Sequence, residues 1–192
     1  LDQGAAGRDP AGCLEVVDHA HGDPVLDAAG RVQVLALGEQ LAVEVGPDAR
    51  LGGEQGCDVR QIVNNARVAQ SAVLLGLSRA VLEYCVPYSK DRVAFDEPIS
   101  KKQSIAFRLA QMHIDIEAMR NLVWQAASFL ENGNDATRVT RLAREYATEK
   151  SMWIADNGVQ VLGGHGFIRE HPVELWFRSA RTLGVLEGAG AV

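Results

Sequence analysis

Three glycines and one glutamate near the C-terminus are the residues whose types and spacing best suit chemistry. Gly163, Gly164 and Gly166 follow a helical pattern that ends at Leu162. Glycines let a backbone approach a ligand closely and present its N–H groups, which suits a phosphate or a cofactor edge. Further along, Glu187 stands among apolar and small neighbours. A carboxyl group there has little water to stabilise its charge and can act as a base of raised pKa.

These residues also have simpler interpretations. The three glycines could form only a helix C-cap and a turn, because glycine ends many helices. Glu187 could be a surface carboxylate in a glycine-rich tail, and Arg92, in a charged stretch, could be a solvated surface arginine. Residue types alone leave both interpretations open.

Composition limits the classes of function. The formal charge of −6 and the pI near 5.4 argue against nucleic acid or an anionic membrane surface as the main partner. No apolar run approaches the roughly 18 residues that span a bilayer. Cys13, Cys57 and Cys85 are widely spaced and outside any C-x-x-C pattern, so we expect reduced thiols in a cytoplasmic protein. The histidines show no metal-ligand spacing, and we expect no metal site.

The first part of the chain has a β-like pattern. Three short Val/Leu runs, at residues 14–17, 32–35 and 41–45, are separated by turn signals and predict strands. Three short strands are too few for a convincing independent domain. We therefore interpret residues 1–57 as the remnant of a β-domain.

From residue 58 to residue 192 the apolar spacing is helical. A first helix is expected to bury a face made of Ile62, Ala66, Ala69, Val73, Gly76 and Ala80. A second, for which Pro98 offers a start, carries the most regular stripe: Ile105, Leu109, Met112, Ile116, Met119, Val123, Ala126 and Leu130.

Two further helices follow. The segment 131–135 supplies a stop and then an N-cap. A third helix over 136–162 is expected to bury Val139, Leu142, Tyr146, Trp153, Ile154 and Val161, and Pro172 opens a short fourth segment. Trp124, Trp153 and Trp176 are interpreted as packing residues. Such stripes must cover one another, so we predict a mainly α protein whose domain 58–192 is an antiparallel up-and-down helical bundle.

Three segments, in this order, resemble the C-terminal half of the acyl-CoA dehydrogenase family. The first is Asp91-Arg92-Val93-Ala94-Phe95-Asp96-Glu97-Pro98-Ile99 with Gln103 after it. The second is Gln160-Val161-Leu162-Gly163-Gly164-His165-Gly166, and the third is Glu187-Gly188. The resemblance covers roughly residues 58 to 190, and the order and spacing of the three motifs make it strong.

This resemblance implies a bound FAD that is shared between subunits. Arg92 would pair with the pyrophosphate, since a guanidinium matches phosphate oxygens, and Phe95 would pack on the cofactor. The remaining cofactor-binding residues would be Gln103 near the nucleotide and Gln160, Gly163 and Gly164 on the adenosine side.

The resemblance also implies the reaction. Glu187 would take the proton next to the thioester carbonyl of an acyl-CoA while hydride leaves the next carbon for the flavin, with Arg67 and Gly188 near the substrate. It further implies electron-transfer flavoprotein as a partner and a homodimer or tetramer, or a hetero-oligomer with a related subunit. In a eukaryote the location would be the mitochondrial matrix.

The chain also departs from the family pattern. Asp96 stands where glycine is usual, Leu186 replaces an aromatic residue, and Ala189 replaces a threonine. We expect that the chain, which begins with Leu1, lacks the N-terminal domain, most of the β-domain and the final helix, and is inactive in isolation. An accessory subunit of a heteromeric dehydrogenase therefore stays open, as does an acyl-CoA oxidase or flavin monooxygenase on the same fold.

Overall fold

The computed structural model describes residues 25–26, 32–36, 39–42 and 57–186, and the chain divides into two units, Leu1–Asp58 and Val59–Val192. The first unit contains a small antiparallel sheet in the order β1-β2-β3, with Gln33 paired to Ala42. Its strands are β1 (Val25–Leu26), β2 (Val32–Ala36) and β3 (Glu39–Ala42). The strands predicted at 32–35 and 41–45 thus coincide with β2 and overlap β3, and the run at 14–17 lies outside the described residues.

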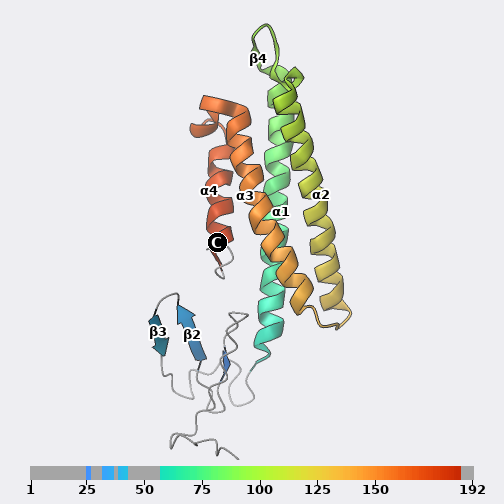
Figure 1. The fold of residues 1–192 in the computed structure, drawn as a ribbon, viewed down its shortest axis with the longest axis vertical. Helices are drawn as coiled ribbons and strands as arrows, with labels where there is room; N and C mark the ends of the chain where they lie inside the picture. Colours follow the sequence, from blue (N-terminus) through green and yellow to red (C-terminus); the bar gives the residue numbers. More distant parts are fainter. Residues whose placement is uncertain (1–24, 27–31, 37–38, 43–56, 187–192) are drawn as a thin grey trace, which may run out of the picture. The chain divides into compact units, whose positions relative to one another are not determined.

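The second unit is a bundle of four helices. Three long helices lie side by side and alternate in direction, and the shorter α4 packs along α3 (Figure 1). The helices are α1 (Val59–Asp91), α2 (Gln103–Glu131), α3 (Thr137–Leu162) and α4 (Val173–Val185). α1 and α3 each contact all three other helices, and their mutual contact is the most extensive in the bundle. The prediction of a mainly α, antiparallel bundle is confirmed.

The connections differ from the prediction at one point. Pro98 does not start α2. It belongs to a two-stranded hairpin, where it pairs with Val93, and a 3₁₀ turn separates it from the helix. The elements of this connection are β4 (Val93–Ala94), β5 (Glu97–Pro98) and η3 (Ile99–Lys101). Between α2 and α3, the Asp135 carboxylate accepts a hydrogen bond from the Thr137 amide at 3.1 Å, which satisfies a free N–H at the helix start.

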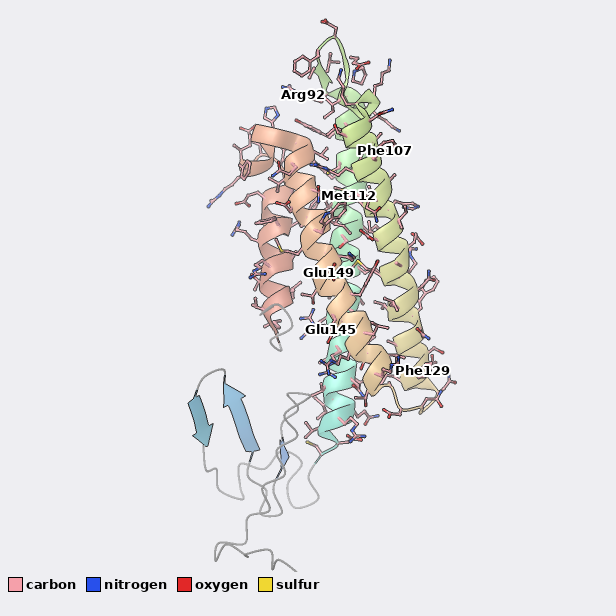
Figure 2. The ribbon with its side chains drawn as sticks, in the orientation of Figure 1. Arg92, Phe107, Met112, Phe129, Glu145 and Glu149 are labelled. Atoms are coloured by element: carbon pink, nitrogen blue, oxygen red, sulfur yellow. The ribbon has the colours of Figure 1, made fainter. Side chains whose placement is uncertain are left out.

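The core confirms the apolar stripe of α2. Met112, Ile116, Met119, Val123 and Ala126 are buried, and Ile105 and Leu109 pack against the same core cluster. Figure 2 shows Met112 directed toward the middle of the bundle. The heptad spacing of these residues places them on one helix face, and that face meets α1 and α3.

The predicted face of α1 is wrong. Val73 is 55% exposed and Ile62 is 48% exposed, whereas Ser71, Leu74 and Ser78 are fully buried. Both serines donate their hydroxyl to a carbonyl one turn earlier, at 2.7 and 2.8 Å, so their burial leaves no unpaired polar group. Small side chains on α1 also let α3 come close. A prediction that looks for large apolar residues therefore selects the exposed face of α1 and not the buried one.

Parts of the predicted α3 face are also wrong. Ile154 and Val161 are buried as expected, but Leu142 and Trp153 are exposed. Trp124 on α2 is 63% exposed and is not a core residue, whereas Trp176 packs against the core. The buried face of α3 consists largely of small residues such as Ala147, Ser151 and Gly158, which suits a helix that packs against three others.

Candidate functional site

A surface pocket of about 350 Å³ lies at the end of the bundle where α1 ends, α2 begins and α3 ends. Figure 2 places Arg92 there, beside the β4–β5 hairpin. The pocket is lined by Tyr88, Arg92, Ala94, Phe95, Ile99, Lys102, Ser104, Ile105, Gln160, Val161, Leu162 and Gly163. Segments far apart in the sequence therefore form one site.

Four predicted cofactor residues line this pocket: Arg92, Phe95, Gln160 and Gly163. Gln103 is exposed at the first residue of α2, between two lining residues, but does not line the pocket itself. The exposed Gly164 follows Gly163 and also lies outside the lining. The structure thus brings four of the residues together and leaves two at the margin.

Sequence reasoning missed three polar lining residues, Tyr88, Lys102 and Ser104, the last directly after Gln103. Tyr88 lies one helical turn before Arg92, and the two are joined by a backbone hydrogen bond of 2.9 Å from the Arg92 amide. Lys102 directly precedes Gln103. Their positions beside predicted site residues were the signal that could have identified them.

The hairpin holds Phe95 out from the bundle. Phe95 and Asp96 have φ values of 56° and 63°, as the two central residues of a type I′ turn require. Such φ values are unfavourable for a residue with a side chain as large as that of Phe95. Phe95 is 89% exposed, so no packing against the bundle compensates for this strain. The Lys102 ammonium lies 5.7 Å from the centre of the Phe95 ring and 2.5 Å from the Glu97 carboxylate. The hydrogen bond from Lys102 lowers the pKa of Glu97.

We predict that Asp96→Gly stabilises the protein, because glycine adopts a positive φ without steric cost. The expected gain is about 0.5–1 kcal/mol, measured as a rise of about 1–4 °C in the thermal midpoint followed by circular dichroism. Asp96→Asn is the control for the lost charge. Asparagine removes the charge but tolerates a positive φ about as well as aspartate does. An equal gain in both variants would assign the effect to charge and contradict the conformational explanation.

The glycine segment forms a 3₁₀ turn, η4 (Gly163–Phe167), directly after α3. Gly163 has φ 59° and ψ −130°, a conformation open essentially to glycine alone. At Gly166 a Cβ atom would lie 2.5 Å from the Val159 carbonyl oxygen and 2.9 Å from the Val159 Cα. One glycine is therefore required by its backbone conformation and the other by close approach to α3.

Two tyrosines of α1 tether the segment after α3. The Tyr88 hydroxyl lies 2.9 Å from His165 Nδ1, and the Tyr84 hydroxyl lies 2.7 Å from His171 Nδ1. The rings of the two histidines are in contact, with centroids 5.5 Å apart. The lining residue Tyr88 thus links the pocket to the glycine turn.

The predicted substrate residue Arg67 lies in a different part of the bundle. Arg67 precedes Arg92 by about seven helical turns, roughly 37 Å along the axis. On the neighbouring α3, which runs in the same direction as α1 (Figure 1), Thr140 donates a hydrogen bond of 2.8 Å to Asn64. Arg67 and Arg144 each follow this pair by about one turn and so lie at the same level. Arg67 therefore does not belong to the pocket.

Glu187 and Gly188 lie outside the described residues, and so do Ala189 and Cys13. The chain is described as far as Leu186, which directly follows α4.

In the described part of the chain, no group of three His, Cys, Asp or Glu side chains could hold a metal ion. None of the described helices is both long enough and apolar enough to cross a membrane.

The buried Cys85 thiol is not a reactive group. Burial raises its pKa to about 12, so that the nucleophilic thiolate is scarce at neutral pH. It contacts α3, where its sulfur lies 3.9 Å from the Gly158 carbonyl oxygen. A Cβ atom at Gly158 would lie 2.5 Å from Val81 Cγ1, which shows how closely α1 and α3 approach at this level.

Comparison with known proteins gives a consistent result. Residues 56–192 match the model of the family described as acyl-CoA dehydrogenase, C-terminal domain. The chain is 36% identical to the short-chain specific acyl-CoA dehydrogenase of Megasphaera elsdenii over 149 residues, which cover 76% of this chain and 39% of that protein. It is 34% identical to the caffeyl-CoA reductase-Etf complex subunit CarC of Acetobacterium woodii over 66% of this chain and 33% of that protein.

A solved structure shows the same fold. The butyryl-CoA dehydrogenase of Megasphaera elsdenii superimposes with a TM-score of 0.67 and 37% identity, and the match covers 71% of this chain and 36% of that chain. This chain thus spans about two-fifths of the length of the curated relatives that it matches.

Proposed function

Because this chain belongs to the acyl-CoA dehydrogenase family, we propose that the protein takes part in the FAD-dependent α,β-dehydrogenation of an acyl-CoA thioester. The observation that carries the proposal is the pocket in which Arg92, Phe95, Gln160 and Gly163 meet. These residues come from two motifs that are far apart in the sequence. They meet only because α1 and α3 end on the same side of the bundle.

The chemistry of this pocket fits a flavin dinucleotide. Arg92 supplies a guanidinium for the pyrophosphate, and its backbone is held on both sides by hydrogen bonds of 2.9 Å, from its amide to Tyr88 and from Ile99 to its carbonyl. Phe95 offers an exposed ring face for a flat apolar group. Gln160 and the backbone at Gly163 supply polar contacts, and we place Gln103 and Gly164 at the edge of the same site.

We propose that this FAD is shared with a neighbouring subunit. Phe95 projects from the end of the bundle and is almost fully exposed, and an aromatic side chain in this position is suited to contact a partner. A homodimer or tetramer, or a hetero-oligomer with a related subunit, would supply the rest of the binding site.

In the proposed reaction, Glu187 takes the proton from the carbon next to the thioester carbonyl. Hydride leaves the adjacent carbon, so that a carbon–carbon double bond forms and the acyl group becomes a 2-enoyl group. The bound FAD supplies the hydride acceptor. Arg67 and Gly188 are proposed to contact the acyl-CoA, and Arg67 lies at a level of the bundle separate from the Arg92 pocket.

We propose electron-transfer flavoprotein as the electron acceptor. The name of one relative, the caffeyl-CoA reductase-Etf complex subunit CarC, includes such a partner. The cytoplasmic location, or the mitochondrial matrix in a eukaryote, stays a prediction.

Asp96, which occupies the strained turn beside the pocket, favours one second candidate: an accessory subunit that lends its bundle to a catalytic partner.

The test is anaerobic reduction of flavin by acyl-CoA thioesters of increasing chain length. It uses the full polypeptide expressed from its own gene with FAD added. We expect loss of the flavin absorbance and turnover only with an electron acceptor. Flavin that is retained only together with a related partner chain would support the accessory subunit, and oxygen consumption equal to turnover would support an oxidase. Absence of flavin under all these conditions would contradict the proposal.

A further inference from the structure

The largest fully buried side chain in the described part of the protein belongs to Arg144 in the middle of α3, which is 2% exposed. A buried guanidinium is costly unless its N–H groups find acceptors. Two of its acceptors are backbone carbonyls at the C-terminal end of α4: Nη2 donates to the Leu183 oxygen at 2.6 Å and to the Leu186 oxygen at 3.1 Å. The Arg144 charge is thus placed at a helix C-terminus, where free carbonyls carry partial negative charge.

The guanidinium is itself held in place. Arg144 Nη1 donates to the Thr148 hydroxyl at 2.9 Å, one turn along α3. At the facing position on α4, a Cβ atom at Gly184 would lie 3.1 Å from Thr148 Cγ2, so the two helices are in close contact here. A small residue at 184 therefore permits the approach that lets Arg144 reach the end of α4.

The carbonyl of Leu186 belongs to the same planar peptide as the nitrogen of Glu187, because the peptide bond does not rotate freely. Leu186 has already left the helix, with φ −62° and ψ 138°. A hydrogen bond to its carbonyl therefore restricts the orientation of the peptide from which Glu187 begins.

We infer that Arg144 is a positioning residue for the catalytic base, and that it acts by holding the peptide that joins α4 to Glu187. The inference rests on the function proposed above, in which Glu187 removes the proton. Precise placement of a base relative to its substrate matters because a shift of about 1 Å can lower the rate about 100-fold. Arg144 itself is not proposed to touch the substrate.

The test compares Arg144→Lys with Arg178→Lys in the flavin-loaded protein, using the acyl-CoA that reduces the flavin best. Lysine keeps the charge but lacks the planar fork that reaches two carbonyls and a hydroxyl. We expect Arg144→Lys to lower kcat per bound flavin about 10- to 100-fold with KM within about twofold. Arg178 lies on α4, is exposed and pairs with Glu174, so its lysine variant should keep kcat within about twofold.

A purely structural role would lower the thermal midpoint or the flavin content but leave kcat per bound flavin unchanged, and that result would overturn the inference. Thr148→Val keeps the arginine and removes the hydroxyl that orients it, and is expected to lower kcat severalfold. It provides the test if Arg144→Lys does not fold, and an unchanged kcat there would equally overturn the inference.

Failure of the inference and failure of the proposed function give different results. If Glu187 is not the base, Glu187→Gln stays active. If Glu187 is the base but Arg144 does not position it, Glu187→Gln is inactive while Arg144→Lys keeps full activity. If both statements hold, Arg144→Lys added to Glu187→Gln causes no further loss, because Arg144 acts through Glu187.

Discussion

Replacement of Glu187 by glutamine is expected to abolish turnover while FAD stays bound. The amide has the size and shape of the carboxylate but cannot accept the proton that must leave the acyl carbon. Loss of a general base costs typically 10²- to 10⁴-fold, and we expect a fall in kcat of at least about 1000-fold. The measurement is turnover with an electron acceptor, normalised to flavin absorbance.

Glu174→Gln is the matched control for this experiment. Glu174 lies in the first turn of α4 and pairs with Arg178 at 3.0 Å. The same chemical change at this position should leave kcat within about twofold, because an exposed ion pair contributes little. If Glu187→Gln kept more than about a tenth of the activity at full flavin content, Glu187 would not be the base.

The second large effect is expected at the glycine turn. A Cβ atom at Gly166 would lie 2.5 Å from the Val159 carbonyl oxygen, and Val159 is buried in α3. Because the obstacle is helix backbone, it cannot rotate away as a side chain could. We expect Gly166→Ala to lower the free energy of unfolding by about 2–3 kcal/mol and to displace the turn that follows Gln160 and Gly163. Urea denaturation followed by circular dichroism measures the first effect, and the flavin content measures the second.

Gly164→Ala separates the close contact from the general effect of losing a glycine. A Cβ atom at Gly164 meets no atom within 4 Å, and its φ lies outside the left-handed region. We expect its unfolding free energy to stay within about 0.5 kcal/mol of the parent value. If the two alanine variants were equally stable, the close approach of Gly166 to Val159 would have no energetic role.

The proposed cofactor site around Arg92 and the proposed acyl-CoA site near Arg67 differ in how they are built. The Arg92 pocket is formed by the ends of three helices and their connecting turns, where backbone groups and long side chains can meet an elongated cofactor. Arg67 lies about seven helical turns from Arg92, and Arg144, which binds the C-terminal end of α4, lies at the level of Arg67. This separation agrees with the proposal made above, in which the bundle binds FAD at its end and an acyl-CoA along its side.

Regular apolar spacing made the fold predictable. The stripe from Ile105 to Ala126 predicted α2 and its buried face, because large apolar side chains at heptad spacing must be covered. The glycine turn and Arg92 were identified from the order of the motifs in the sequence. Glycine is recognisable because the local backbone conformation requires it, and arginine because of its charge. The segment before α2 was not predicted in detail, because Pro98 is compatible with both a helix start and a strand.

Only the tertiary structure decided the contacts between residues distant in the chain. Ser71 and Ser78 are buried because each hydroxyl is satisfied within its own helix and each side chain is small enough for α3 to approach. Residue type alone placed them on the outside. Tyr88 meets His165, and Arg144 meets the carbonyls of Leu183 and Leu186, across gaps in the sequence that no local pattern spans. The sequence by itself therefore determined which helices form and which motifs are proposed to carry the chemistry, whereas packing decided which faces are buried and which polar groups surround those motifs.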